Sequence, residues 1–174
     1  MFTDPVKNLK AFGLSENMIV ADLGAGSGFY TIPAAEMVSR GKVYAIEIQK
    51  DFLITIKNKA TENHLNNIEY LLGDIEKIGG TKLKDSIVDA VIVSNILFQV
   101  EEKDKLITEI KRILKPIGKV LLIDWSDSSY PIGPSTDKII SKNKAKEMFE
   151  KEGFVLEREI DAGIHHYGMI LVNS

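Results

Sequence analysis

The sequence predicts a doubly wound α/β fold, in which a mostly parallel seven-stranded sheet with an antiparallel last strand carries helices on both faces. Short apolar runs alternate with helical patterns along the chain, as expected for strands joined by crossover helices. Residues 89–93 are apolar after the first position, which is typical of a strand covered on both faces. The chain has 174 residues and is 44% hydrophobic, so we expect a single domain over residues 1–174.

Seven strands are expected from short runs of apolar and β-branched residues. They span residues 18–23, 42–48, 68–72, 88–93, 119–124, 154–160 and 167–172. The last two are joined by Asp161, Ala162 and Gly163, a sequence typical of a hairpin. The final strand is therefore predicted to run antiparallel.

Helical periodicity is clearest in residues 51–64 and 103–114, where apolar side chains recur on one face. Pro116 and Gly118 are expected to stop the second of these helices and to turn the chain into the fifth strand. A third helix is expected over residues 141–152. Before it, residues 127–137 are rich in Ser, Pro and Gly, which predicts a loop and a candidate lid.

Composition narrows the class of protein. The net charge of -3 and the pI near 5.7 give no general attraction for a polyanion, so nucleic acid is not an expected partner. Signal-peptide features and apolar stretches of about 20 residues are missing from the sequence, which predicts a cytoplasmic protein without membrane insertion. The chain has no cysteine and its three histidines lack helical i, i+4 spacing, so no metal site is expected.

A glycine-rich turn follows the first strand and precedes a helix. It reads Asp22, Leu23, Gly24, Ala25, Gly26, Ser27, Gly28. Glycine lets a ligand approach the backbone closely, and the N–H groups at a helix start favour an anionic group. Phe29 stands where the dinucleotide fingerprint has its third glycine, and the charge of Asp22 opposes a pyrophosphate. The turn therefore favours a ligand that carries both a cation and a carboxylate.

At this turn the sequence resembles the class I, seven-stranded family of S-adenosylmethionine-dependent methyltransferases. The resemblance covers most of the chain, and it implies that S-adenosylmethionine is the cofactor and that the turn holds its methionine end. Residues 114–120 also resemble the small-molecule branch, which includes the ubiquinone and menaquinone methyltransferases. We read that segment as structural.

Glu47, followed by Ile48, ends the second strand about 20 residues after the glycine turn, where a carboxylate can accept both ribose hydroxyls of a nucleoside. An acid here does not discriminate alone, because an NAD-binding protein places one at the same point. An exposed glutamate at a strand end is the structural alternative.

Two further strand ends complete the predicted cofactor site. Gly73, Asp74 and Ile75 resemble the adenine site of the family, in which Asp74 accepts from the exocyclic amine and Ile75 packs on the ring. An ordinary turn containing aspartate is the alternative. Ser94 and Asn95 end the fourth strand beside the first, at the switch point where open α/β sheets bind ligands.

A base for methyl transfer is needed only when the acceptor must lose a proton early, and it must then lie at the carboxyl edge of the parallel strands. His165 and His166 begin the antiparallel strand at that edge, and His166 is preferred because the His-Tyr-Gly segment resembles small relatives of the family. A surface position is the alternative for both. Asp124, Trp125 and Tyr130 are the next candidates, with Trp125 favoured as packing.

These observations predict an S-adenosylmethionine-dependent methyltransferase with a small-molecule acceptor and a possible homodimeric assembly. The alternatives are a non-catalytic protein that binds the same cofactor for regulation, and an NAD-binding oxidoreductase, which the glycine spacing disfavours. A protein or RNA acceptor stays open if a partner subunit completes the site.

Overall fold

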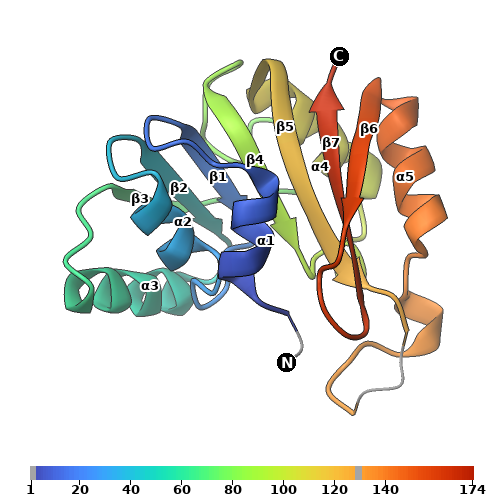
Figure 1. The fold of residues 1–174 in the computed structure, drawn as a ribbon, viewed down its shortest axis with the longest axis horizontal. Coiled ribbons are helices and arrows are strands. Elements are labelled where there is room, and N and C mark those ends of the chain that lie inside the picture. The colour runs from blue at the N-terminus through green and yellow to red at the C-terminus, as the bar shows by residue number, and fades with distance from the viewer. Residues whose placement is uncertain (1–2, 128–130) are drawn as a thin grey trace.

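The computed structural model describes residues 3–127 and 131–174, and a seven-stranded sheet runs through its centre (Figure 1). The strands are β1 (Ile19–Leu23), β2 (Lys42–Glu47), β3 (Ile68–Leu72), β4 (Val88–Ser94), β5 (Leu114–Trp125), β6 (Phe154–Ile160) and β7 (His166–Asn173). Their order across the sheet is β3-β2-β1-β4-β5-β7-β6. β7 pairs antiparallel with β5 and with β6, and the other paired strands are parallel. The predicted fold class is confirmed.

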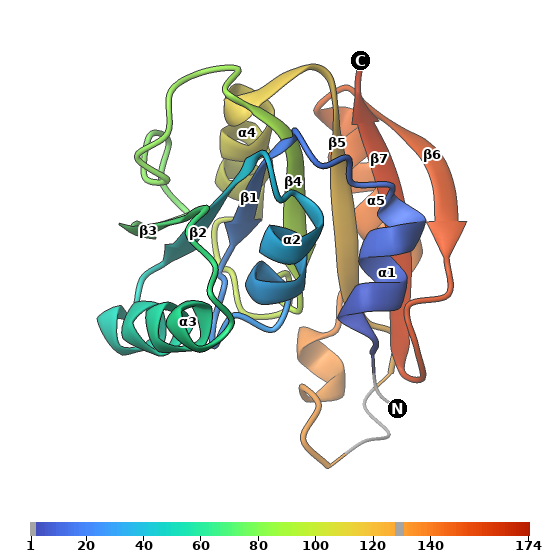
Figure 2. The ribbon, with the colours of Figure 1, turned by 60° about the vertical axis from the view of Figure 1, so that its left-hand side comes forward.

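Helices cover both faces of this sheet, as predicted (Figure 2). One face packs against α1 (Pro5–Phe12), α2 (Thr31–Met37) and α3 (Lys50–Glu62), and the other packs against α4 (Lys103–Ile113) and α5 (Lys142–Lys151). A short 3₁₀ turn, η1 (Thr136–Lys138), precedes α5. The buried residues in the middle of β1, β2, β4 and β5 are mostly aliphatic because both sides of the sheet are covered.

The order of the strands decides where a ligand can bind. β1 lies between β2 and β4, so the chain leaves β1 in one direction first and returns to its other side later. Loops that leave the carboxyl ends of β1 and β4 therefore diverge and open a crevice between them. The antiparallel β7 begins at this same edge, which we call the carboxyl edge.

The helix α1 was not singled out from the sequence. It has eight residues, and its first turn is set by Asp4, whose carboxylate accepts a hydrogen bond from Lys7 N at 3.0 Å, and by Pro5 at the first helical position. Leu9 and Phe12 are buried against the sheet. About two helical turns are too short for a clear periodic pattern, so the burial is decided by tertiary packing.

The predicted helix end before Pro116 is confirmed, but the predicted start of the next strand at residue 119 is wrong. α4 ends at Ile113, and β5 begins directly at Leu114, which pairs with Val88. The register then shifts between Val88 and Ala90, so the segment with Pro116 and Gly118 is an irregular part of β5. Ile117 has a positive φ of 60° at this irregularity.

In the described part of the chain, no helix is long and apolar enough to span a bilayer.

Candidate functional site

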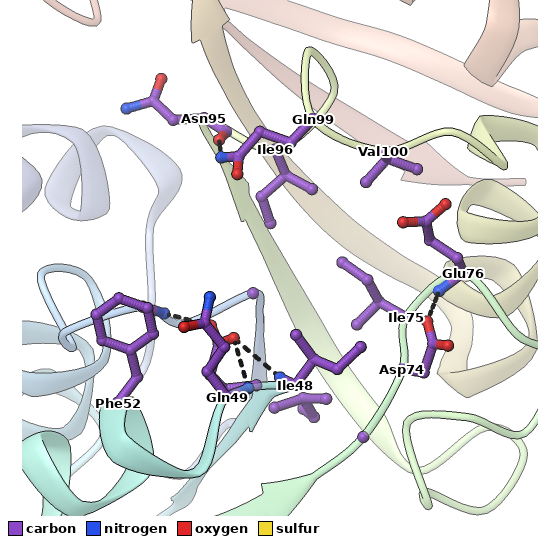
Figure 3. A pocket seen from close by; sticks show the side chains of 15 residues that line it. Ile48, Gln49, Phe52, Asp74, Ile75, Glu76, Asn95, Ile96, Gln99 and Val100 are labelled. Carbon is purple, nitrogen blue, oxygen red and sulfur yellow. Dashed lines mark hydrogen bonds between the residues drawn. The ribbon is translucent and has the colours of Figure 1, made fainter. Parts of the chain in front are cut away.

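A cavity of about 400 Å³ opens at the carboxyl edge, where β1, β2, β3 and β4 end (Figure 3). The lining includes these residues predicted from the sequence: Gly24, Gly26, Glu47, Ile48, Gly73, Asp74, Ile75 and Asn95. It also includes residues that the sequence did not single out: Ile46, Gln49, Phe52, Glu76, Ile96, Gln99 and Val100. Asp22, Ala25, Ser27, Gly28 and Ser94 are not part of the lining. Four successive strand ends thus contribute to one cavity.

The glycine turn is docked on β2 through its backbone. The N–H groups of Gly24 and Ala25 both donate to the carbonyl oxygen of Ile46, at 2.9 and 3.0 Å. A Cβ at Gly24 would lie 2.6 Å from Ile96 Cδ1, so the Ile96 side chain would have to shift. At Gly26 the nearest atom to such a Cβ would be 4.0 Å away, which leaves room beside the backbone. Both positions have positive φ.

Glu47 ties the turn to the end of β2. Its Oε2 accepts from Gly26 N at 2.9 Å, and its Oε1 accepts from Ile48 N at 2.9 Å and from Gln49 N at 3.1 Å. The residue is only 6% exposed. A carboxylate has about four lone-pair positions, so Glu47 can still accept a hydrogen bond from a ligand. This placement disfavours the alternative of an exposed glutamate at a strand end.

Asp22 lies beneath the turn and does not line the cavity. The residue is 3% exposed, and its Oδ2 accepts from the Thr31 hydroxyl at 2.6 Å, which joins the end of β1 to the start of α2. Burial raises the pKa of Asp22 to about 6, and the charge of Glu47 adds to this effect against the opposing Thr31 hydrogen bond. The sequence suggested a direct contact between Asp22 and an ammonium group, whereas the described contact is with Thr31.

Ala25, Ser27 and Gly28 belong to the turn but face away from the cavity lining. Gly28 lies against Ile56 of α3. The carbonyl oxygen of Ser27 accepts from Lys59 Nζ at 2.7 Å, so the turn is also held by α3. These positions shape the turn from behind.

The wall opposite the glycine turn comes from the loop after β3. Asp74 Oδ1 accepts from Glu76 N at 3.0 Å, and its Oδ2 lies 2.8 Å from Lys77 Nζ. The hydrogen bond and charge of Lys77, together with the Glu76 N–H, lower the pKa of Asp74. Figure 3 shows the apolar side chain of Ile75 on this loop and that of Val100, which belongs to the loop after β4, above it. A carboxylate beside an apolar slot suits a flat polar ring.

Ser94 and Asn95 end β4 in different surroundings. Asn95 has a φ of 56°, lines the cavity, and carries a buried Oδ1 without a hydrogen-bond partner. Ser94 is outside the lining and forms a side-chain hydrogen bond with Tyr30, which also bonds Asn8 at 3.0 Å. The two neighbours therefore face a ligand and the protein interior, respectively.

Asp124, at the end of β5, is 1% exposed and accepts three backbone N–H groups. Its Oδ2 accepts from Ile96 N at 3.1 Å and Leu97 N at 2.8 Å, and its Oδ1 accepts from Trp125 N at 2.8 Å. Burial raises the pKa of Asp124 to about 6, although these three N–H groups oppose it. The residue fixes the loop after β4, and this structural use does not favour it as a base.

His166 begins β7 at the carboxyl edge and is not part of the cavity lining. Its Nδ1 lies 3.1 Å from the carbonyl oxygen of Ile164, which can only accept, so Nδ1 carries the proton and the lone pair is on Nε2. Nε2 is buried and has no partner. The ring packs at 4.4 Å from that of Trp125. Burial lowers the pKa of His166, so the imidazole is neutral at pH 7.

His165 has different partners. Its φ is 67°, and its Nδ1 lies 2.9 and 3.0 Å from the two carboxylate oxygens of Asp127. Its side chain is 25% exposed. The predicted candidate Tyr130 lies outside the described residues, as does part of the predicted lid. Across the residues that are described, no group of His, Asp and Glu could hold a metal ion.

Unpartnered buried polar atoms gather near this edge. In residues 3–127 and 131–174 they are Asn8 Oδ1, Asn95 Oδ1, His166 Nε2 and the Tyr167 hydroxyl. Three of these belong to the strand ends of β4 and β7 at the carboxyl edge. Buried polar groups are nearly always hydrogen-bonded, so such a concentration points to a ligand that completes the bonds.

Comparison with known proteins decides the family. A family model described as a methyltransferase domain matches residues 14–160. The chain belongs to this methyltransferase family. It is 32% identical to an S-adenosylmethionine-dependent methyltransferase from Aquifex aeolicus, with a TM-score of 0.90 over 99% of this chain and 91% of that one. It is 28% identical to a putative type 11 methyltransferase from Sulfolobus solfataricus, with a TM-score of 0.79 over 100% of this chain and 94% of that one.

Curated relatives extend the likeness to named enzymes. A ubiquinone/menaquinone biosynthesis C-methyltransferase from Francisella tularensis is 30% identical over 138 residues, which are 78% of this chain and 53% of the relative. An arsenite methyltransferase from Halobacterium salinarum is 29% identical over 119 residues, 67% of this chain and 30% of the relative. The chain thus spans about half the length of the quinone methyltransferases it matches. The predicted resemblance to a methyltransferase family is confirmed.

We expect Gly26→Ala to weaken binding of S-adenosylhomocysteine by about tenfold or more, because its methyl group would occupy the space beside the backbone of the turn. The folded chain has no atom within 4.0 Å of the new Cβ, so unfolding by urea should shift only by the strain of positive φ, about 1 kcal/mol. Calorimetry measures the affinity. Gly13→Ala is the matched control, with φ of 81° and no neighbouring atom within 4 Å. Equal affinities for Gly26→Ala and wild type would contradict the expectation.

We expect Asp22→Asn to be increasingly more stable than wild type as the pH rises from about 4 to about 6. Since the folded pKa of Asp22 is raised to about 6, the folded chain holds this proton more tightly than the unfolded chain. Wild type therefore loses stability across this window, by about 3 kcal/mol at about 1.4 kcal/mol per pH unit. An asparagine keeps an oxygen for the Thr31 hydroxyl. Urea unfolding at several pH values measures the difference, and a constant difference would refute the argument.

Proposed function

We propose that this chain transfers the methyl group of S-adenosylmethionine to a small neutral organic acceptor at the carboxyl edge. The charge of the cavity is the observation that carries the proposal. Its described lining has the carboxylates of Glu47, Asp74 and Glu76 and no Lys or Arg. Such a lining attracts a cationic sulfonium and repels the pyrophosphate of a dinucleotide.

Different residues of the cavity suit the methionine, ribose and adenine parts of the cofactor. The open space and backbone at Gly26 suit the methionine end, and Asp22 supplies a negative field from beneath. Glu47 retains a free acceptor position for a ribose hydroxyl. Asp74 and Ile75 suit the amine and the face of adenine, as the resemblance implied. Ser94 supports this arrangement through Tyr30, and Asn95 faces the reacting end.

We place the acceptor beside this cavity, over the ends of β5 and β7. The cofactor supplies an electrophilic methyl group on sulfur, with a neutral thioether as the leaving group. The chain's part is to align the acceptor and to remove its proton. His166 is neutral, buried and unpaired at Nε2, so it can accept that proton from a hydroxyl or N–H group. Asp124 and His165, already held by the backbone and by Asp127, are secondary candidates.

The proposed acceptor is organic and small. A soft metalloid such as arsenite prefers thiolate ligands, and this chain has no cysteine. The unpartnered Asn95 Oδ1 and His166 Nε2 are hydrogen-bond acceptors, so they suit an acceptor molecule that donates. Relatives named for quinone methylation give one such class to test. We keep the possible homodimer and the absence of nucleic-acid partners as proposals.

Binding and product formation test the proposed function together. Calorimetry should show binding of S-adenosylhomocysteine and none of NAD. Incubation with methyl-labelled S-adenosylmethionine and a panel of hydroquinone, catechol, aromatic amine and arsenite should label an organic acceptor. Binding of NAD alone would refute the proposal. Cofactor binding without transfer to any organic acceptor would favour the non-catalytic alternative.

We expect His166→Ala to lower kcat by about 10²–10⁴-fold while the affinity for S-adenosylhomocysteine changes less than about twofold. The wild-type rate should fall with pH below neutrality, because protonation of Nε2 removes the base, and this decline should be missing in the variant. Steady-state kinetics against pH measure both effects. His64→Ala, at an exposed position after α3, is the matched control and should match wild type. Unchanged turnover in His166→Ala would remove this residue from the role.

A further inference from the structure

The loop over residues 73–81, which we call the wall loop, forms one side of the cavity and is bonded to the opposite side. Glu76 Oε2 accepts from the backbone N–H groups of Glu101 at 2.9 Å and Glu102 at 2.8 Å. These two residues directly follow Val100, which lines the facing side. In Figure 3 the Glu76 side chain extends toward this segment. Glu76 therefore spans the two sides of the apolar slot.

The same residue also holds the polar group of the slot. The N–H of Glu76 donates to Asp74 Oδ1 at 3.0 Å. A shift of Glu76 would therefore move the carboxylate of Asp74 together with the width between Ile75 and Val100. Glu76 thus affects both the carboxylate of Asp74 and the apolar side chains that a planar ring would contact.

A second glutamate fixes the far end of the wall loop to α4. Glu109 is 0% exposed and accepts from Gly79 N at 2.8 Å, from Thr81 N at 3.2 Å and from the Thr81 hydroxyl at 2.6 Å. Arg112 donates to both of its oxygens, each at 2.8 Å. Burial opposes the charge, but Arg112 and the loop donors outweigh it and lower the pKa of Glu109 to about 2. The anchor is therefore ionised at every physiological pH.

Close packing within the loop prevents it from relaxing around these anchors. Asp74 N donates to the carbonyl oxygen of Gly80 at 3.0 Å. A Cβ at Gly80 would lie 1.9 Å from Asp74 O, and one at Gly73 would lie 2.4 Å from Gly80 O. The two ends of the loop thus touch backbone to backbone, and the geometry set by Glu109 is transmitted to Asp74.

We propose that Glu76 is a positioning residue that sets the width of the nucleoside slot, with Glu109 as the fixed base from which it acts. The inference rests on the proposed function, since it takes the slot between Ile75 and Val100 as the adenine site. A slot held open at its bound width spares the ligand the cost of ordering the loop. Loss of the Glu76 carboxylate should therefore weaken the nucleoside end specifically.

Calorimetry with two probes, S-adenosylhomocysteine and adenosine, tests this role in the full chain. Glu76→Ala should weaken both probes by the same factor, about tenfold, because both carry the nucleoside. Glu76→Gln should recover most of the affinity, since its amide oxygen can still accept from Glu101 N and Glu102 N. Amide hydrogen exchange at these two residues should speed up in Glu76→Ala only. Glu62→Ala, an exposed glutamate at the end of α3, is the matched control.

The outcomes separate this inference from the proposed function. If wild type fails to bind S-adenosylhomocysteine, both the proposed function and the role of Glu76 are refuted. If wild type binds and Glu76→Ala binds both probes as tightly as wild type does, the role of Glu76 alone is overturned. Should Glu76→Ala fail to fold, Glu76→Asp replaces it, because the shorter side chain keeps the charge but not the reach. Wild-type affinity in that variant would equally overturn the inference.

Discussion

The architecture of the carboxyl edge depends on one kind of contact, a carboxylate, buried in every case except Glu76, that accepts backbone N–H groups from a loop. Glu47 does this for the glycine turn and the start of the loop after β2. Asp124 does it for the loop after β4, and Glu76 and Glu109 do it for the start of α4 and the wall loop. Loops at a sheet edge have N–H groups that no strand can pair, so a side chain must satisfy them.

This solution determines the charge of the site. Glu47 and Glu76 add negative potential where the loops meet, whereas Lys77 pairs with Asp74 and Arg112 pairs with Glu109. A cationic ligand gains from this field, whereas a dinucleotide phosphate would be repelled. The selection of a sulfonium cofactor over a dinucleotide thus follows in part from the way the loops are held.

The sequence predicted the sheet well because each strand is a short apolar run, and burial on both faces leaves a strong local signal. It was weaker where tertiary contacts decide. The helix α1 is too short to show periodicity, and β5 starts four residues before the irregularity at Gly118 because a shifted register with β4 lets the strand continue. Pro116 follows the end of α4 by three residues, as its local preference suggests, but it lies within β5 and not in a loop.

The candidate site shows the same division. Gly24, Gly26, Glu47 and Asp74 were predictable, because a turn and three strand ends carry them to the same edge. The burial of Asp22 beneath the turn was not predictable, because it depends on the Thr31 hydroxyl of α2, which only folding brings close. Glu76 and Glu109 gave no signal either. Their partners lie 25 to 30 positions away in the sequence, and a glutamate in a helix or loop is usually exposed.

Burial of these acids also links cofactor binding to protonation. Asp22 and Asp124 both have a pKa raised to about 6 by burial, so at neutral pH the folded chain carries ionised groups in surroundings that disfavour charge. Asp22 also repels Glu47 of the cavity lining. A cation bound in the cavity would favour the ionised forms and lower these pKa values, which offsets part of the unfavourable energy. The ionised carboxylates at this edge are thus least stable when the cavity is empty. This is the physical reason why a cationic cofactor suits the site.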